Sequence, residues 1–466
     1  MDFHHALTIN EDKCIGCTHC MKVCPTEAIR VREGKALLEA NRCIDCGECY
    51  RACPVDAIYV EQDDYSKIFE FKYRVALVPA IFIGQFPRNI ITRKIYSILI
   101  EEGFTHVYEA EHASEICGEN LNRIIDDSMS EKPIISTFCP AVVRLIQVKY
   151  PYLVENIANV KPPNEIAAMS FKKHLMESEG AKEEEIGIFY VTPCAAKIAS
   201  LKSPIGDFEG VAGVINMNYL FNRVWAKLQN EKDSCHFYPH KEQLSDKEML
   251  WSLSRGETKN MHGRRISVDG IHNVIRFLQR VEDGTAGQFD FLELRACDQS
   301  CAGGILSSNN RFLAVERMEN RAQRYLNDAA KGKKFRPKSL PKYIDYLQEH
   351  IEVGEIPPRS MDTLDEDREV ALKKMQRIRS MMCYLPGIDC GACGSPSCHA
   401  LAEDIVQKRA AISDCVFIQK TMMTSGKLSA EHSLKITQKV WGENKFDKDC
   451  YKKGAKNEGL DAGEET

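Results

Sequence analysis

Sixteen of the twenty cysteines fall into four sets of four, and the spacing within each set suits an iron-sulfur cluster. Two sets repeat one pattern, in which three cysteines are separated by two residues each and a fourth, followed by proline, comes four positions later. This spacing lets three thiolates face one 4Fe-4S cluster while the fourth crosses to another. The first set is Cys14, Cys17, Cys20 and Cys24, and the second is Cys43, Cys46, Cys49 and Cys53.

The repeat extends beyond the ligands, because residues 25–29 are matched by residues 54–58. We therefore predict that residues 1–64 form a small α+β dicluster domain of the bacterial ferredoxin type, with pseudo-twofold symmetry. Zinc is disfavoured, because zinc sites pair two-cysteine motifs and need no third cysteine at this offset.

Composition and charge restrict the class of protein. The chain has 466 residues, 44% hydrophobic and 28% charged, which is enough for two or three globular domains. The net charge of -5 is mild, so nucleic acid is not expected as a partner. Residues 1–13 lack the apolar core of a secretory signal, and the longest apolar stretch, residues 75–86, is too short to span a bilayer. We expect a cytoplasmic protein, in which thiols stay reduced and cysteines bind metal.

Three strand-like segments in the middle of the chain run into cysteines. Residues 133–138 precede Cys139 and a helical pattern over 142–154, residues 186–191 precede Cys194 and a helix over 195–201, and residues 289–295 precede Cys297, with Cys301 following. Residues 65–350 alternate such runs with amphipathic stretches, which predicts an α/β domain with parallel strands. A lone cysteine at a strand end is usually a small buried residue. If the three runs belong to one parallel sheet, however, the four thiolates meet at its carboxyl edge, beside helix amino-termini that favour a negative cluster.

A further set lies near the end of the chain, with C-x2-C-x4-C-x16-C spacing: Cys390, Cys393, Cys398 and Cys415. It resembles the 4Fe-4S module of corrinoid iron-sulfur proteins and of the Rnf-type electron-transport subunit. We predict a small, mostly helical module over residues 375–420, with a helix over 400–411. Residues 350–380 are expected to begin as a linker, and the polar residues 444–466 to form a disordered tail. Cys383 is an unassigned neighbour.

The middle domain resembles the iron-only (di-iron) hydrogenase superfamily through residues 137–141, 192–197 and 296–301, and the resemblance covers about residues 1–320. It implies that the 4Fe-4S part of the H-cluster is held by Cys139, Cys194, Cys297 and Cys301, with Cys301 bridging to the di-iron unit. Lys197 matches the lysine that binds the cyanide of that unit, the alternative being a solvated helix lysine. Residues 78–80 resemble a segment that lines the same pocket.

Four residues depart from the catalytic members of this family. Phe138 replaces a cysteine that passes protons, and Ser200 replaces an acidic residue on the proton path. Thr192 and Arg295 stand where methionine is usual. Because proton transfer needs groups of matched pKa within hydrogen-bond reach, enzymatic hydrogen turnover is left in doubt.

The domain order is similar to that of the sensory branch of the family. The main hypothesis is a redox protein that moves electrons among three 4Fe-4S clusters and an H-cluster-like site, with a sensory or low-activity hydrogen interaction. The alternative is an electron-transfer or scaffold protein holding only 4Fe-4S clusters, without a di-iron unit. No nucleotide-binding glycine motif occurs, so the partner is expected to be a redox protein, such as a ferredoxin or an oxidoreductase subunit, or a separate signalling protein.

Four more residues could be ligands by type, but we expect them to pack in the interior, lie at the surface or hydrogen-bond near a cluster: Cys117, Cys235, Cys450 and His19.

Overall fold

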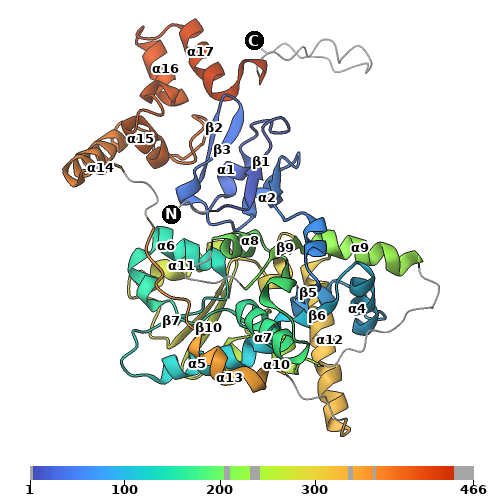
Figure 1. Ribbon diagram of the computed structural model, residues 1–466. Helices are drawn as coiled ribbons and strands as arrows, with labels where there is room; N and C mark the ends of the chain where they lie inside the picture. The colour runs from blue at the N-terminus through green and yellow to red at the C-terminus, as the bar shows by residue number, and fades with distance from the viewer. Residues whose placement is uncertain (1–3, 204–209, 231–241, 334–338, 360–363, 446–466) are drawn as a thin grey trace. The chain divides into compact units, whose positions relative to one another are not determined.

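The computed structural model describes residues 4–203, 210–230, 242–333, 339–359 and 364–445, and it divides into two compact units (Figure 1). The first unit combines residues 1–8, 40–51 and 59–361. The second combines residues 9–39, 52–58 and 362–466. Each unit therefore contains part of the cysteine repeat at the start of the chain. Among the described residues, every helix is too short or too polar to cross a membrane.

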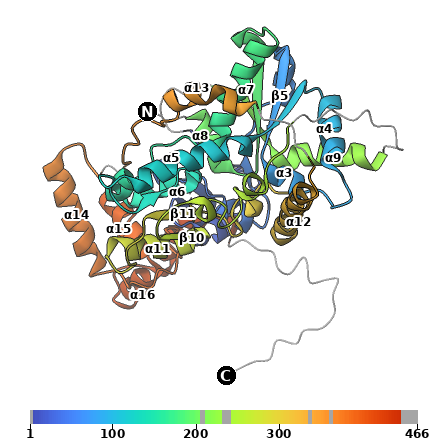
Figure 2. The same ribbon diagram turned by 90° about the horizontal axis from the view of Figure 1, so that it is seen from below.

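The larger sheet of the first unit is parallel and has four strands in the order β6-β5-β8-β9. Its central strand β5 pairs Val75 with His106 of β6 and with Ile188 of β8. Alternate residues of β5 enter two different cores, since Val75 packs with α5 and α7 while Ala76 packs with α3, α4 and α9. Figure 2 shows α7 and α9 on opposite sides of β5. The strands are β5 (Tyr73–Val78), β6 (His106–Glu109), β8 (Ile186–Thr192) and β9 (Gly213–Asn216).

A second parallel sheet has three strands in the order β10-β11-β7. Its central strand pairs Phe291 with Ile134 of β7 and with Arg265 of β10. Leu292 and Leu294 of the central strand pack against α6 and α11 in a separate apolar core. The strands are β7 (Ile134–Ile135), β10 (Arg265–Asp269) and β11 (Phe291–Arg295).

The helices of the first unit cover both sheets, so the fold class is α/β with parallel sheets, as the sequence predicts. They are α3 (Ala80–Gly84), α4 (Thr92–Glu101), α5 (Ser114–Asp126), α6 (Pro140–Lys149), α7 (Pro163–Ser178), α8 (Ala195–Lys202), α9 (Met217–Asn230), α10 (Asp246–Leu250), α11 (Ile271–Glu282), α12 (Arg311–Ala330) and α13 (Ile344–Glu349). Short 3-10 turns join them: η2 (Tyr65–Glu70), η3 (Ala110–Ala113), η4 (Pro151–Asn156), η5 (Glu183–Glu185), η6 (Thr258–Asn260), η7 (Ser300–Gly303) and η8 (Leu340–Tyr343).

The second unit joins part of the cysteine repeat to the module at the end of the chain. Its antiparallel hairpin, β2 (Ile29–Arg32) and β3 (Lys35–Leu38), lies beside α17, whose backbone accepts hydrogen bonds from Glu33 and Gly34. The helices are α1 (His19–Val23), α14 (Arg368–Met382), α15 (Cys398–Val406), α16 (Val416–Thr424) and α17 (Ala430–Trp441), with η9 (Ile412–Asp414) and η10 (Glu443–Lys445). Four short elements near the start of the chain fall wholly or partly in the first unit: β1 (Leu7–Ile9), η1 (Ala40–Arg42), α2 (Glu48–Ala52) and β4 (Ile58–Val60).

Several predicted elements need correction. The three cysteine-ended strands belong to two sheets, because β8 lies in the four-stranded sheet while β7 and β11 lie in the three-stranded one. The helix predicted to reach residue 154 ends at Lys149, since the residue before Pro151 cannot stay helical. The helix predicted over 400–411 ends at Val406, before Lys408 takes a φ of 61°. The linker expected from residue 350 does lead into a helix, which begins at Arg368. Of the predicted disordered tail, residues 446–466 lie outside the described residues.

Candidate iron-sulfur centres

Two parallel sheets bring the cysteines of the middle domain to one cavity. Its lining includes four cysteines from three loops, together with Phe138, Lys197 and Arg295: Cys139, Cys194, Cys297 and Cys301. Cys46, from the second half of the repeat, lies in the same lining. The predicted convergence is therefore present in the structure, although the strands come from two sheets. Residues 78–80 are not among the described residues that line this cavity.

Helix amino-termini and backbone N–H groups surround these thiols. Cys139 is the N-cap residue of α6 and Cys194 is the N-cap residue of α8, so both sulfurs lie where helix dipoles favour negative charge. The backbone N–H of Ala296 donates to Cys139 Sγ at 3.5 Å. Burial and then the Cys139 thiol raise the pKa of Cys194 to about 12, since four thiols share one site. Four cysteine sulfurs with helix N-termini around them are a donor set that fits a 4Fe-4S cluster.

Lys197 is buried, with 6% of its surface exposed, so the alternative of a solvated helix lysine does not hold. Its Nζ lies 3.3 Å from the Tyr190 hydroxyl and 4.1 Å from the centre of the Phe138 ring. Burial alone would lower the pKa of Lys197, but Tyr190, Cys301 and Cys194 raise it above its usual value. The ammonium group therefore stays charged beside the thiols.

The Phe138 ring contacts two cations. Arg295 Cζ lies 4.0 Å from the centre of the ring that Lys197 also contacts. Arg295 Nη2 donates to Glu257 Oε2 at 2.7 Å, and Glu257 Oε1 accepts from the Ser136 hydroxyl at 2.8 Å. Burial opposes the charge of Arg295, but Glu257 and Glu293 raise its pKa. Two of the residues that depart from the family pattern thus contact each other.

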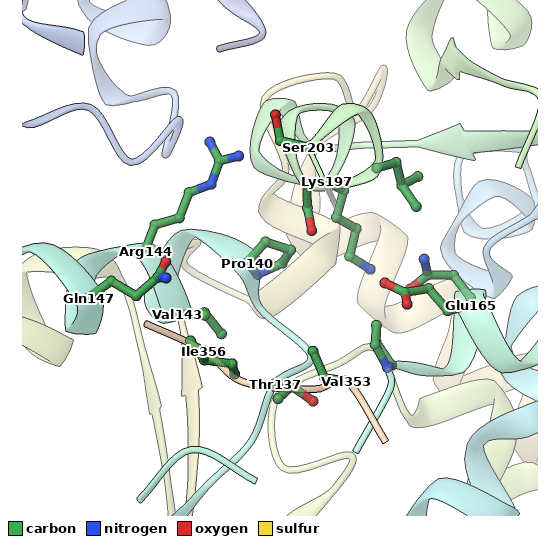
Figure 3. A pocket seen from close by; sticks show the side chains of 14 residues that line it. Thr137, Pro140, Val143, Arg144, Gln147, Glu165, Lys197, Ser203, Val353 and Ile356 are labelled. Carbon is green, nitrogen blue, oxygen red and sulfur yellow. The ribbon is translucent and has the colours of Figure 1, made fainter. Parts of the chain in front are cut away.

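A second pocket, with a volume of ≈ 60 Å³, is also lined by Lys197 (Figure 3). Ser200 lines it, and so does Glu165 from the first turn of α7. Figure 3 shows the Glu165 carboxylate and the Lys197 amine directed toward one another. Glu165 could not be predicted from the sequence, because its position has no local signal. Only the fold brings it into a pocket with Lys197 and Ser200 of α8.

Four cysteines of the repeat meet in the second unit. One cavity is lined by Cys14, Cys17, Cys20 and Cys53, which is the crossed set that the spacing predicts. Burial and then Cys17, Cys14 and other nearby thiols raise the pKa of Cys20 to about 12. The pseudo-twofold repeat extends to the backbone, since Ala28 donates to Cys24 Sγ and Ala57 donates to Cys53 Sγ, each at 3.2 Å.

The remaining cysteines of the repeat are divided between the units. Cys43, Cys46 and Cys49 belong to the first unit and Cys24 to the second. The loop that carries the first three is fixed by Asp45, whose carboxylate accepts from the backbone N–H of Ala6 at 3.0 Å and lies 2.8 Å from His5 Nδ1. Asp45 also forms a buried ion pair with Arg144 of α6.

Four cysteines also come together near the end of the chain. Cys393, Cys398 and Cys415 share one apolar core, whereas Cys390 is exposed. Burial raises the pKa of Cys393 to about 11, with Cys415 and Cys390 adding to the effect. Gly391 and Gly394 have φ values of 75° and 77°, which side chains rarely adopt, so glycine suits these ligand loops.

The cysteines and the histidine that were not expected to be ligands lie in different environments from the four sets. Cys117 is buried in α5, where its thiol donates to the Lys161 carbonyl at 3.4 Å. Cys383 follows α14 and is exposed. His19 begins α1. Cys235 and Cys450 lie outside the described residues.

Three segments of the chain match known families of iron-sulfur proteins. Residues 6–54 match a 4Fe-4S dicluster domain, and residues 385–417 match an Fe-S cluster family. Residues 72–205 match the iron only hydrogenase large subunit, C-terminal domain. This last match includes Cys139, Cys194 and Lys197 and ends before the third cysteine motif. The chain is an iron-sulfur protein with a ferredoxin-like domain, and it is related to the iron-only hydrogenases.

Individual proteins are similar over larger or smaller parts of the chain. The periplasmic Fe hydrogenase large subunit of Nitratidesulfovibrio vulgaris is 26% identical over 360 residues, which cover 64% of this chain and 86% of the relative. The cytosolic Fe-S cluster assembly factor NAR1 of Candida dubliniensis is 24% identical over 124 residues, which cover 27% of this chain and 21% of the relative. A solved variant of the hydrogenase HydA1 from Chlamydomonas reinhardtii has a TM-score of 0.48 and 13% identity, covering 63% of this chain and 97% of the other.

Proposed function

We propose that this protein is a redox protein of the iron-only hydrogenase superfamily with a sensory or low-activity hydrogen interaction. Three sets of cysteines would each hold a 4Fe-4S cluster: Cys14, Cys17, Cys20 and Cys53; Cys139, Cys194, Cys297 and Cys301; and Cys390, Cys393, Cys398 and Cys415. Cys43, Cys46 and Cys49 of the first unit would be ligands of a fourth cluster. The clusters would supply one-electron transfer. In this proposal Lys197 would donate a hydrogen bond to a cyanide of a di-iron unit beside Cys301.

The observation that carries the proposal is the environment of Lys197. A buried ammonium group beside the thiols is suited to an anionic ligand, and its cost in desolvation is offset by Tyr190 and Cys301. At the same time Phe138 and Arg295 fill the wall where the family has proton-carrying and thioether side chains. A phenyl ring cannot transfer a proton, which supports slow hydrogen turnover rather than fast catalysis.

The test is an infrared spectrum of the full chain produced together with the di-iron maturation enzymes. Bands of CO and cyanide ligands are expected, and they should be lost or shifted in Lys197→Met. Iron should exceed the amount that four 4Fe-4S clusters require. A matured protein with its full cluster iron but no CO or cyanide bands would exclude this function.

A second candidate is an electron-transfer or scaffold protein that holds only 4Fe-4S clusters. The observation in its favour is the contact of Arg295 with the Phe138 ring, because the ion pair with Glu257 holds a bulky cation in the lining that contains Cys301. The same infrared spectrum, without CO and cyanide bands, together with silence in hydrogen assays, would support it.

A protein partner is part of either proposal. We propose a cytoplasmic redox protein, such as a ferredoxin or an oxidoreductase subunit, or a separate signalling protein. One relative is described as a subunit of an NADP-reducing hydrogenase, from Solidesulfovibrio fructosivorans, and it is 23% identical over 41% of this chain. Co-purification of the tagged full chain under anaerobic conditions, followed by reduction of its clusters by the captured protein, is the test.

A further inference from the structure

Glu165 places a carboxyl group in the pocket that Ser200 lines. Glu165 belongs to α7 and Ser200 to α8, and the pocket wall also contains Lys197. Figure 3 shows the Glu165 carboxylate and the Lys197 amine facing each other. An acidic group is therefore present in this pocket, although position 200 does not provide it.

Lys197 connects this pocket with the cysteine-lined cavity. It is the one charged residue that lines both, within the part of the chain that the structure describes. The pocket wall includes half-buried residues, such as Ser203 and Val353, as well as the buried Lys197. Partly exposed residues, Glu165 and the buried Lys197 thus line one pocket, and Lys197 also lines the cavity of the thiols.

The charges around Glu165 suit proton exchange at neutral pH. Desolvation raises the pKa of Glu165 to about 7, while Lys161 and Lys197 act in the opposite direction. Arg144 lines the same pocket, but its guanidinium group is paired with Asp45. A carboxyl group whose pKa lies near the working pH can both accept and release a proton.

We propose that Glu165 is the group that takes up a proton when the site formed by Cys139, Cys194, Cys297 and Cys301 gains an electron, with Lys197 as the charge between them. The inference rests on the proposed function, because it requires a redox centre at these cysteines. The electron comes from a reduced protein partner, or from dithionite in the experiment. The proton comes from water and forms a new O–H bond on the Glu165 carboxylate, so the added negative charge is balanced.

The physical reason is that like charges raise the free energy of one another. An electron added beside Lys197 makes the surroundings of Glu165 more negative, which favours the protonated carboxyl group. Because linkage is reciprocal, protonation of Glu165 must favour reduction of the site by the same amount. The midpoint potential of the site should therefore fall as pH rises through the pKa of Glu165.

The experiment is a potentiometric titration of the cluster-loaded full chain at several pH values on both sides of neutrality, followed by electron paramagnetic resonance. The signal of this site is identified as the one lost in Cys297→Ala. Wild type should show a pH-dependent midpoint potential. The dependence should be lost in Glu165→Gln, retained in Glu165→Asp, and unchanged in the control Glu155→Gln, which alters an exposed carboxylate of η4.

A second measurement keeps the test independent of the clusters. The infrared band of protonated carboxyl groups should lose one component with a midpoint near neutrality in Glu165→Gln. Unchanged pH dependence of the potential in Glu165→Gln, at full iron content, would overturn this inference alone. A chain that holds no iron at these four cysteines would overturn the proposed function and this inference with it.

Discussion

Phe138 is buried, and two cations contact its ring. Lys197 Nζ and Arg295 Cζ lie 4.1 and 4.0 Å from the ring centre. Desolvated cation–π contacts are worth up to about 2 kcal/mol. The Phe138 ring therefore has a structural role, since it contacts two buried positive charges.

Phe138→Leu should lower the free energy of unfolding by about 2 to 3 kcal/mol, because it removes both cation–π contacts as well as apolar volume. Phe291→Leu is the matched control, since Phe291 is equally buried in an apolar core and its replacement should cost about 1 kcal/mol. Denaturant unfolding followed by circular dichroism measures both. If both variants lose the same free energy of unfolding, the two cation–π contacts do not stabilise the fold.

A buried carboxyl group gives the first unit a pH-dependent stability. Burial raises the pKa of Glu111 to about 7, although its Oε2 accepts the Ala80 backbone N–H at 2.7 Å. The folded chain therefore keeps this proton up to about pH 7, whereas the unfolded chain releases it near its ordinary value of 4.5. Because the folded state binds more protons between these values, stability falls as pH rises through this window.

Glu111→Gln should remove this part of the pH dependence, because glutamine keeps the acceptor for Ala80 and does not ionise. The difference between the two proteins should grow to roughly 3 kcal/mol between pH 5 and pH 8. Thermal unfolding across this range is the measurement. A variant with the same pH profile as wild type would mean that Glu111 is ionised in the folded state at low pH.

At the scale of elements, local patterns predicted the helices that follow Cys139 and Cys194: α8 starts at the expected Ala195, whereas α6 starts at Pro140, two residues before the predicted start. The segments that form strands were also predictable, because their apolar residues alternate between two cores. The pairing of strands into two sheets was not, since register between distant segments leaves no trace in local periodicity. The same holds for Glu165 and for Asp45, whose partner Arg144 lies 99 positions away.

The Asp45–Arg144 pair fixes the loop of Cys43 and Cys46 to α6, whose N-cap is Cys139. Burial lowers the pKa of Arg144 to about 10, and Asp45 opposes this shift. Removing one partner leaves an uncompensated buried charge, which costs roughly 3 to 5 kcal/mol.

A double-mutant cycle should therefore show strong coupling. Asp45→Asn and Arg144→Met should each lower the free energy of unfolding strongly. The double variant should lose about 2 kcal/mol less than the sum of the two single losses. The combination of Asp45→Asn with Lys172→Met, which removes an exposed pair with Glu183, should be additive. Additivity in the first cycle would mean that the two side chains do not form a pair in solution. Unfolding free energies from denaturant titrations decide between these results.

At the scale of the whole molecule, the second unit joins segments from opposite ends of the chain through Asp404. This buried carboxylate pairs with Arg30 and Arg32 of β2, both at 2.8 Å, and with Arg409 at 3.3 Å. The backbone N–H of Val31 also donates to the carbonyl of Gly394, between Cys393 and Cys398. Glu27 Oε2 accepts from the Ser397 hydroxyl at 3.1 Å. The hairpin of the first repeat and the terminal cysteine loop are thus one cooperative structure.

Asp404→Asn should therefore weaken both segments together. Leaving Arg30 and Arg32 without a buried carboxylate should cost roughly 3 kcal/mol or more, which corresponds to amide hydrogen exchange about 100-fold faster. The increase is expected in residues 29–38 as well as in α15, while β5 and β8 of the first unit should exchange as in wild type. Glu431→Gln, which alters an exposed carboxylate of α17, should leave the rate of amide exchange unchanged in all of these regions. Faster exchange confined to α15 would show that the terminal module opens independently of the hairpin, so that the segments fold as separate domains.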